Sequence, residues 1–214
     1  RLSAASSGYQ SVLPLSLITR FLSDLVLDNA NKEDLSIKEK KQIEKEVNKV
    51  MNDKSLTDGV KFAMLRNISS RFKYSCFVNI VEEMELNLYP ESQRSVLFDL
   101  LSYANKIELN RLVLTTHSPY VINYLTLAAK AFLLTQKVSA NETLQERVKE
   151  VVPADSAIDP ARLRIYELKD GGVFRLSTYE GLPSDENFLN IQLGVTNELF
   201  DQLLEIEQEF DYKN

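Results

Sequence analysis

Cysteine is almost absent from these 214 residues, and Cys76 stands alone. A single thiol excludes an internal disulfide and a zinc site built from several cysteines. No run of 18 uninterrupted apolar residues occurs, and the longest candidate, residues 121–134, is broken by Asn123 and Lys130. No signal peptide is recognisable either. The sequence therefore predicts a soluble, cytoplasmic chain with no membrane partner.

Glycine is also scarce. The six glycines include no Gly-Lys pair, and the pattern G-x-x-x-x-G-K-[ST] does not occur. In nucleotide-binding proteins that loop holds the phosphates with its backbone N–H groups and its lysine. This chain is therefore not expected to hold a nucleoside triphosphate tightly on its own.

The charge balance gives no general sign of nucleic-acid binding. The chain carries 25 basic and 31 acidic residues, a net charge of −6, so its overall surface is acidic, although a local basic patch is compatible with that total. Hydrophobic residues make up 44% of the chain, enough for one substantial core.

An apolar segment that ends in carboxylates is the most informative stretch. In CFVNIVEEMELNLYP, residues 77–81 are rich in β-branched and aromatic side chains, which predicts a buried strand. Glu82 and Glu83 follow at its carboxyl end, where ligands collect in parallel sheets. Adjacent side chains at a strand end point in different directions, so one can bind a metal ion while the other faces a water molecule. The alternative is an ordinary solvated turn.

The only histidine follows a second apolar strand. Residues 90–105 have helical spacing, and residues 111–116, RLVLTT, predict a strand that ends just before His117. Strand, helix and strand at this spacing form a βαβ unit with parallel strands. His117 is therefore expected at the same sheet edge as Glu82 and Glu83. A lone histidine is more often structural, but this position favours a functional role.

The first apolar helix is preceded by Ser6-Ser7-Gly8-Tyr9-Gln10. Helical spacing extends over residues 11–27, and Pro14 fits the first turn of a helix, which predicts a start near residue 10 or 11. The free N–H groups at such a start suit a phosphate. Taken alone, the segment also fits an ordinary helix entry.

The remaining segments predict structure rather than chemistry. Residues 28–72 predict a charged helical insertion, with a capping box between Ser36 and Glu39. Residues 163–178 predict a β-hairpin around Asp170-Gly171-Gly172. Residues 187–210 predict one or two helices with no site residues.

Three of these segments together resemble the second half of an ABC-type ATPase domain, most closely the RecF-like and OLD-family ATPases of the SMC-like AAA type. SSGYQ is similar to the signature motif, VNIVEE to the Walker B strand, ELNLYP to the D-loop region, and TTHSP to the switch. The resemblance implies an α/β fold, the C-terminal lobe of a P-loop ATPase, with parallel strands flanked by helices. It covers residues 5–10, 77–90 and 112–120, and residues 1–214 would form one such lobe.

The resemblance also implies roles. Glu83 is the catalytic carboxylate, His117 the switch that senses the γ-phosphate, and Glu82 a Mg²⁺ ligand. ATP bound in this way lies between two protomers and contacts the signature residues of the opposite one. Those signature residues are Ser6, Ser7, Gly8 and Gln10.

The implied partners are a second protomer, in an ATP-dependent homodimer, and a Walker A-containing N-terminal half, which this sequence lacks. The sequence begins at Arg1 rather than Met, which suggests a fragment of a longer protein. ATPases of this kind serve DNA repair, chromosome maintenance or phage defence, with DNA or a nuclease as further partners. Several positions depart from the family pattern: Tyr9 replaces a glycine, Glu82 an aspartate, Met84 a proline and Tyr89 a histidine.

Two other functions fit parts of the sequence. An ATPase lobe without its P-loop half can serve as a non-catalytic interaction module. A metal nuclease could use Glu82, Glu83 and Glu85, although the sequence offers no further Asp or His ligands and no basic channel beside them.

Overall fold

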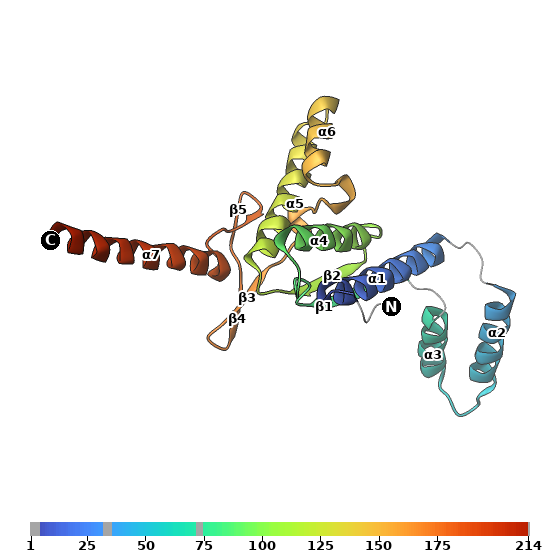
Figure 1. Cartoon of the computed structure of the whole chain (residues 1–214). Coiled ribbons are helices and arrows are strands. Elements are labelled where there is room, and N and C mark those ends of the chain that lie inside the picture. Colours follow the sequence, from blue (N-terminus) through green and yellow to red (C-terminus); the bar gives the residue numbers. More distant parts are fainter. Residues whose placement is uncertain (1–4, 32–35, 72–74, 214) are drawn as a thin grey trace.

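The computed structural model describes residues 5–31, 36–71 and 75–213, which form a mixed α/β structure with small parallel and antiparallel sheets (Figure 1). The helices are α1 (Ser7–Asn31), α2 (Ile37–Asn52), α3 (Asp58–Arg71), α4 (Pro90–Asn105), α5 (Pro119–Lys137), α6 (Glu142–Val151) and α7 (Phe188–Lys213), with short 3-10 helices at Ala154–Ser156 and Pro160–Arg162. The strands are β1 (Val78–Glu82), β2 (Arg111–Thr115), β3 (Tyr166–Lys169), β4 (Gly172–Arg175), β5 (Thr178–Tyr179) and β6 (Leu182–Pro183).

A βαβ unit is the centre of the molecule. β1 and β2 pair in parallel, with Ile80 opposite Val113 and Glu82 opposite Thr115, and α4 makes the crossover between them. The predicted helix over residues 90–105 is confirmed to the residue, because Pro90 starts it in the first turn, where no backbone N–H is needed. The α/β character and the parallel pairing predicted from the sequence are therefore confirmed.

The core lies between this strand pair and the helices on one of its faces. Leu97 of α4 and Val121 and Ala128 of α5 are fully buried, and Val81 of β1 packs into the same cluster. Leu112 and Leu114 of β2 contact it from the sheet. Every second residue along β1 and β2 therefore faces the helices.

The other face of the strand pair is open. Val78, Ile80 and Val113 expose 59%, 67% and 47% of their surface. The prediction of a buried strand therefore holds for one face of β1 only, the face that carries Val81. Among the described residues, helices cover only one face of the strand pair, and no further strand lies beside β1 or β2. Parallel sheets in proteins are normally covered on both faces.

Helix α1 begins earlier than predicted. It starts at Ser7, so Pro14 lies inside the helix rather than in its first turn. Gln10 N–H donates to Ser6 O at 3.0 Å, which shows that the helical pattern is already established there. Gly8 is buried, and Val12 and Leu15 pack against the core, so tertiary contacts hold the turns before Pro14 despite the missing N–H.

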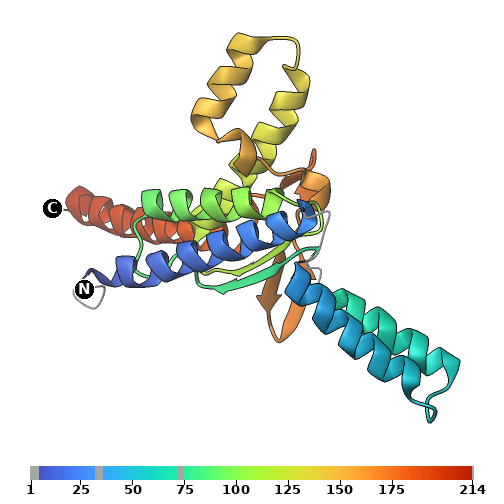
Figure 2. The ribbon, with the colours of Figure 1, turned by 90° about the vertical axis from the view of Figure 1, so that its right-hand side faces the viewer.

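Polar contacts tie α1 to the βαβ unit, beside α4 (Figure 2). Asn79 Nδ2 donates to Thr19 Oγ1 at 3.1 Å. The Lys106 ammonium, which donates to Asp24 Oδ1 at 2.9 Å, holds the pKa of that carboxyl below its usual value. This ion pair is present at neutral pH and is lost as the pH falls through the lowered pKa.

The segment Ser7–Asp28 of α1 is also long and apolar enough to cross a membrane by length and composition. From the sequence, residues 121–134 rather than α1 were predicted to be the longest apolar segment. The contacts of Thr19 and Asp24 with other elements fit a helix that packs on protein.

The charged insertion forms a helical hairpin. α2 and α3 pack side by side and project away from the βαβ unit (Figures 1 and 2). The predicted capping box is confirmed: Glu39 N–H donates to Ser36 Oγ, and Ser36 N–H donates to Glu39 Oε2 at 2.8 Å. Of the predicted insertion, residues 28–31 continue α1, and residues 32–35 and 72 lie outside the described part of the chain.

The C-terminal third adds two small hairpins and a long helix. β3 and β4 confirm the predicted hairpin, and Asp170 and Gly171 turn it with positive φ angles of 50° and 75°. A second pair, β5–β6, was not predicted, because strands of two residues carry no periodic signal. The predicted C-terminal helical segment is the single helix α7.

Candidate functional site at the carboxyl end of the parallel strands

The structure brings Glu83 and His117 together. His117 Nε2 lies 3.5 Å from Glu83 Oε1, at the end of the strand pair where β1 and β2 both terminate. The His117 side chain is 84% exposed and the Glu83 side chain 46%, so both can reach a ligand from solvent. Two residues predicted from separate motifs, 34 positions apart, thus form one polar pair because parallel strands end at the same edge.

The backbone at Glu83 has a rare conformation. Its φ angle is 46°, in the left-handed region that non-glycine residues seldom adopt. The Glu83 N–H donates to Thr115 O at 3.0 Å and approaches Thr115 Oγ1 at 3.3 Å, which fixes the turn against β2. Conformations of this kind cost about 1–3 kcal/mol and cluster at functional sites.

Glu85 holds the loop that carries His117. Its Oε1 accepts a hydrogen bond from the His117 N–H at 2.6 Å, while its Oε2 is buried with no partner among the described residues. From the sequence, Glu85 was expected only as part of the D-loop-like segment or as a nuclease ligand. Its contact with the His117 backbone makes it a positioning residue for the histidine.

A buried amide links the same loop to the segment after β1. Gln93 accepts a hydrogen bond from Ser118 Oγ at 2.6 Å and donates to Leu88 O at 3.0 Å. Gln93 lies in the first turn of α4 and is buried. No sequence signal distinguished it from other polar residues in a first turn, since its role depends on two loops that meet only in the fold.

Glu82 lies beside this pair but points elsewhere. It is the last residue of β1. Because side chains alternate along a strand, Glu82 lies on the same face as Val78 and Ile80, the open face of the strand pair. In the described part of the chain, no three Asp, Glu, His or Cys side chains gather closely enough to bind one metal ion. A Mg²⁺ ion at Glu82 would therefore need ligands from ATP, water or another chain.

The signature-like residues lie at the start of α1, apart from the Glu83–His117 pair. Ser6 and Ser7 are exposed, and Gln10 Nε2 donates back to Ala5 O at 2.7 Å. Gly8 is buried against the segment after β1, where a Cβ atom would lie 2.8 Å from Asn87 O. Within the described residues, no hydrogen bond or ion pair joins Ser6, Ser7 or Gln10 to Glu82, Glu83 or His117.

The contact at Gly8 gives a testable difference between two helical glycines. Gly8→Ala should lower the free energy of unfolding by about 1–3 kcal/mol, because the backbone carbonyl of Asn87 must move. Gly194 in α7 has open space around it, so Gly194→Ala should raise helix content and cost no stability. Urea unfolding and far-UV circular dichroism measure both. Equal effects of the two substitutions would contradict the close packing of Gly8.

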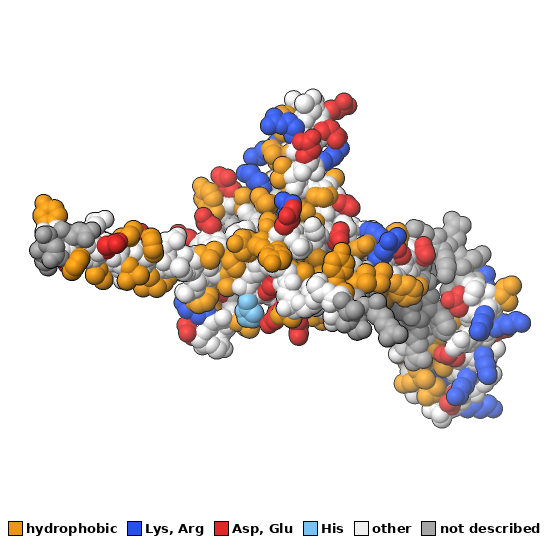
Figure 3. Space-filling model, in the orientation of Figure 1, with side chains coloured by type: hydrophobic (Ala, Val, Ile, Leu, Met, Phe, Trp, Pro, Cys, Tyr) orange, Lys and Arg blue, Asp and Glu red, His pale blue; other side chains and the backbone are white. Residues whose placement is uncertain are grey.

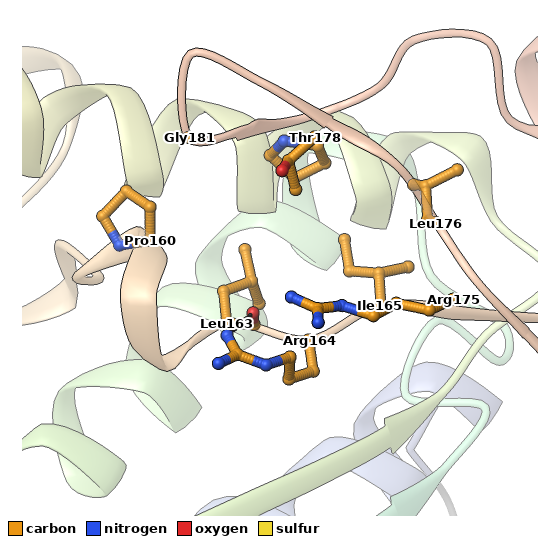
Figure 4. A pocket seen from close by; sticks show the side chains of 9 residues that line it. Pro160, Leu163, Arg164, Ile165, Arg175, Leu176, Thr178 and Gly181 are labelled. Atoms are coloured by element: carbon orange, nitrogen blue, oxygen red, sulfur yellow. Dashed lines mark hydrogen bonds between the residues drawn. The ribbon is translucent and has the colours of Figure 1, made fainter.

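Two cavities of the described chain lie away from this site. A hollow beside the second 3-10 helix, lined by residues such as Pro160, Leu163 and Arg175, holds about 10 Å³, room for one water molecule (Figure 4). A groove of about 480 Å³ lies between α5 and α6. Neither is lined by Glu82, Glu83 or His117.

Comparison with known proteins gives no relative from which a role could be transferred. No protein-family model matches the chain, no curated protein matches it, and no solved structure matches it.

Proposed function

We propose that this chain is the C-terminal lobe of an ABC-type ATPase of the RecF/OLD-like kind, which hydrolyses ATP only together with a Walker A-containing half. The meeting of Glu83 and His117 at the carboxyl end of two parallel strands carries the proposal. In nucleotide hydrolysis, catalysis comes mostly from positioning the water and stabilising charge on the transferred phosphoryl group. A carboxylate and an imidazole at one sheet edge supply a group for each task.

Each residue has one task in this proposal. Glu83 polarises the attacking water, and His117 donates a hydrogen bond to the γ-phosphate. Glu82 binds Mg²⁺, which neutralises phosphate charge when it is present. The start of α1, with Ser6, Ser7 and Gln10 exposed and Gly8 buried behind them, contacts ATP held by a second protomer. ATP then acts as the contact that brings two protomers together.

The open face of the strand pair supports the proposal that a further protein segment, the Walker A half, packs against it. Val78, Ile80 and Val113 present an apolar face, and β1 and β2 have free edges in the described part of the chain. A Walker A half of the usual α/β kind would add strands and helices there. We place the complete ATPase in the cytoplasm, in DNA repair, chromosome maintenance or phage defence, with DNA or a nuclease as partner.

Two observations bear on the rival functions. A metal nuclease built on Glu82, Glu83 and Glu85 is disfavoured, because these carboxylates do not converge and Glu85 is engaged by the His117 backbone. A non-catalytic interaction module keeps some support from the large exposed apolar surface. The left-handed backbone at Glu83 does not separate the two functions, since Asp170 and Glu180 adopt the same conformation in the hairpin turns.

The test compares ATP hydrolysis by residues 1–214 alone with hydrolysis by the complete protein. Residues 1–214 alone should release no phosphate from Mg-ATP above background, because no loop holds the β- and γ-phosphates. Addition of the Walker A half, in one polypeptide or as a separate chain, should produce hydrolysis that depends on Glu83. Hydrolysis by residues 1–214 alone that is lost in Glu83→Gln would show that the phosphate cradle lies within this chain. A complete protein that binds a partner but never turns over ATP would favour the interaction module.

A further inference from the structure

The helical hairpin of α2 and α3 is basic in an otherwise acidic chain. Residues 37–71 contain nine basic and five acidic residues, a net charge of +4, whereas the whole chain has a net charge of −6. The hairpin projects from the βαβ unit (Figures 1 and 2), and Figure 3 shows Lys and Arg side chains along its outer edge. A local basic surface of this kind attracts a polyanion even though the chain as a whole is acidic.

One face of α2, here called the lysine face, carries four of the five lysines of the helix: Lys38, Lys41, Lys45 and Lys49. At about 3.6 residues per turn, these four lie within about 80° of one another around the helix axis. Three amide residues lie in or beside the same arc: Gln42, Asn48 and Asn52. The acidic residues of α2 all lie about 60° or more outside it: Glu39, Glu44 and Glu46. The lysine face therefore presents only cationic and amide side chains.

The four lysines are available to a partner. All four are exposed, and no ion pair or hydrogen bond joins their ammonium groups to another residue in the part of the chain that the structure describes. The opposite face of α2 is the one that packs on α3: Val50 is buried, and Ile43 and Val47 are partly buried. Packing within the hairpin thus turns the lysine face outward.

The composition of the lysine face favours a nucleic acid over a protein or a membrane. Protein interfaces depend on apolar and aromatic anchors and are depleted in lysine, whereas this face has no apolar residue and α2 has no aromatic one. A helix that binds a membrane inserts its apolar face into the lipid, but the apolar face of α2 is covered by α3. Lysine ammonium and amide N–H groups are donors that proteins use to bind nucleic-acid phosphates.

We propose that the lysine face of α2 binds duplex DNA through its phosphates, without reading the base sequence. From Lys38 to Lys49 the face is about 16 Å long at about 1.5 Å per residue. The major groove of B-form DNA is about 12 Å wide. A helix that lies across this groove therefore brings the lysines at its two ends to the phosphates of both strands.

The other forms of nucleic acid fit less well. The major groove of A-form RNA is deep and narrow, so it does not admit the outer face of a helix. Single strands are bound by stacking their bases on aromatic side chains, and α2 has none. The inference rests on the proposed function, in which DNA is one partner, but the contact itself needs neither ATP nor the Walker A half.

A triple substitution tests the lysine face. Lys41→Gln, Lys45→Gln and Lys49→Gln together remove three phosphate contacts, and glutamine keeps the helix propensity close to that of lysine. Fluorescence anisotropy with a short labelled DNA duplex, without nucleotide, measures the affinity of residues 1–214 over a range of salt concentrations. The wild-type slope of log K against log salt should lie between about −3 and −4, about 0.9 for each phosphate neutralised. The triple variant should bind at least tenfold more weakly, with a slope reduced by about 3.

Two controls separate the face from net charge. The same three changes at exposed lysines elsewhere, Lys130, Lys137 and Lys169, alter the net charge equally and should leave the affinity unchanged. Arginine at residues 41, 45 and 49 keeps the charge and should retain binding. Far-UV circular dichroism checks that each variant is folded. Equal loss in the two glutamine triples, or a wild-type chain that does not bind the duplex, would overturn the proposal.

Two further probes identify a different partner. Binding to duplex RNA as tight as to DNA would contradict the fit to the B-form groove. Lysine-dependent binding to phosphatidylserine vesicles, with none to DNA, would assign the face to a membrane surface instead. DNA binding through α2 by a complete protein that never hydrolyses ATP would contradict the proposed function alone and leave this contact standing.

Discussion

Glu83→Gln in the complete protein, with the Walker A half present, should hydrolyse ATP about 10²–10⁴-fold more slowly than the wild type. The amide keeps the size of the carboxylate and most of its hydrogen bonds, but it cannot polarise the attacking water. Affinity for Mg-ATP should survive, because the phosphates belong to the Walker A half and the metal ion to Glu82. Single-turnover hydrolysis and equilibrium nucleotide binding measure the two quantities separately.

The same variant should also change the oligomeric state. ATP that stays uncleaved binds only the dimer in this mechanism, so it shifts the equilibrium toward the dimer by mass action. Size-exclusion chromatography with light scattering should therefore show a dimer with Mg-ATP that persists in Glu83→Gln and decays in the wild type. Adding Ser7→Arg, which puts a bulky charge at the exposed start of α1, should abolish this dimer without changing thermal unfolding.

The matched control for Glu83→Gln is the same substitution at a carboxylate on helix α2. Glu44→Gln removes a carboxylate from exposed α2, far from the sheet edge, and should change neither rate nor assembly. Normal hydrolysis by Glu83→Gln would move the catalytic role to Glu82 or Glu85. A slow variant that stays monomeric with Mg-ATP would leave Ser7 and Gly8 without a role across protomers.

The sequence predicted the βαβ unit because its signals are local and mutually consistent. Apolar runs of five or six residues, a proline at a helix start and helical spacing between them specify two parallel strands and their crossover. The rule that parallel strands end at one edge of a sheet then predicts that Glu83 lies near His117. The hairpin at Asp170-Gly171 was predicted for a similar reason, since that dipeptide suits positive φ angles.

Other features depend on contacts that no local pattern encodes. The composition of residues 77–81 suits burial on both faces, yet burial depends on which elements are present to cover them, so Val78 and Ile80 are exposed. Pro14 is tolerated inside α1 because Gly8 and Val12 pack against distant segments. The hydrogen bond from His117 N–H to Glu85 depends on two loops, after β1 and after β2, that meet only in the folded chain.

His117→Ala in the complete protein should lower turnover by about 10²–10³-fold, the usual cost of removing one donor that stabilises transition-state charge. ATP affinity should hardly change, because that hydrogen bond matters most as charge redistributes on the γ-phosphate. The side chain is 84% exposed, so thermal unfolding should not change either. His117→Gln, which restores an amide donor, should recover part of the rate. An unchanged rate in His117→Ala, measured beside Glu83→Gln in the same preparation, would show that this histidine only packs beside Glu83 and takes no part in hydrolysis.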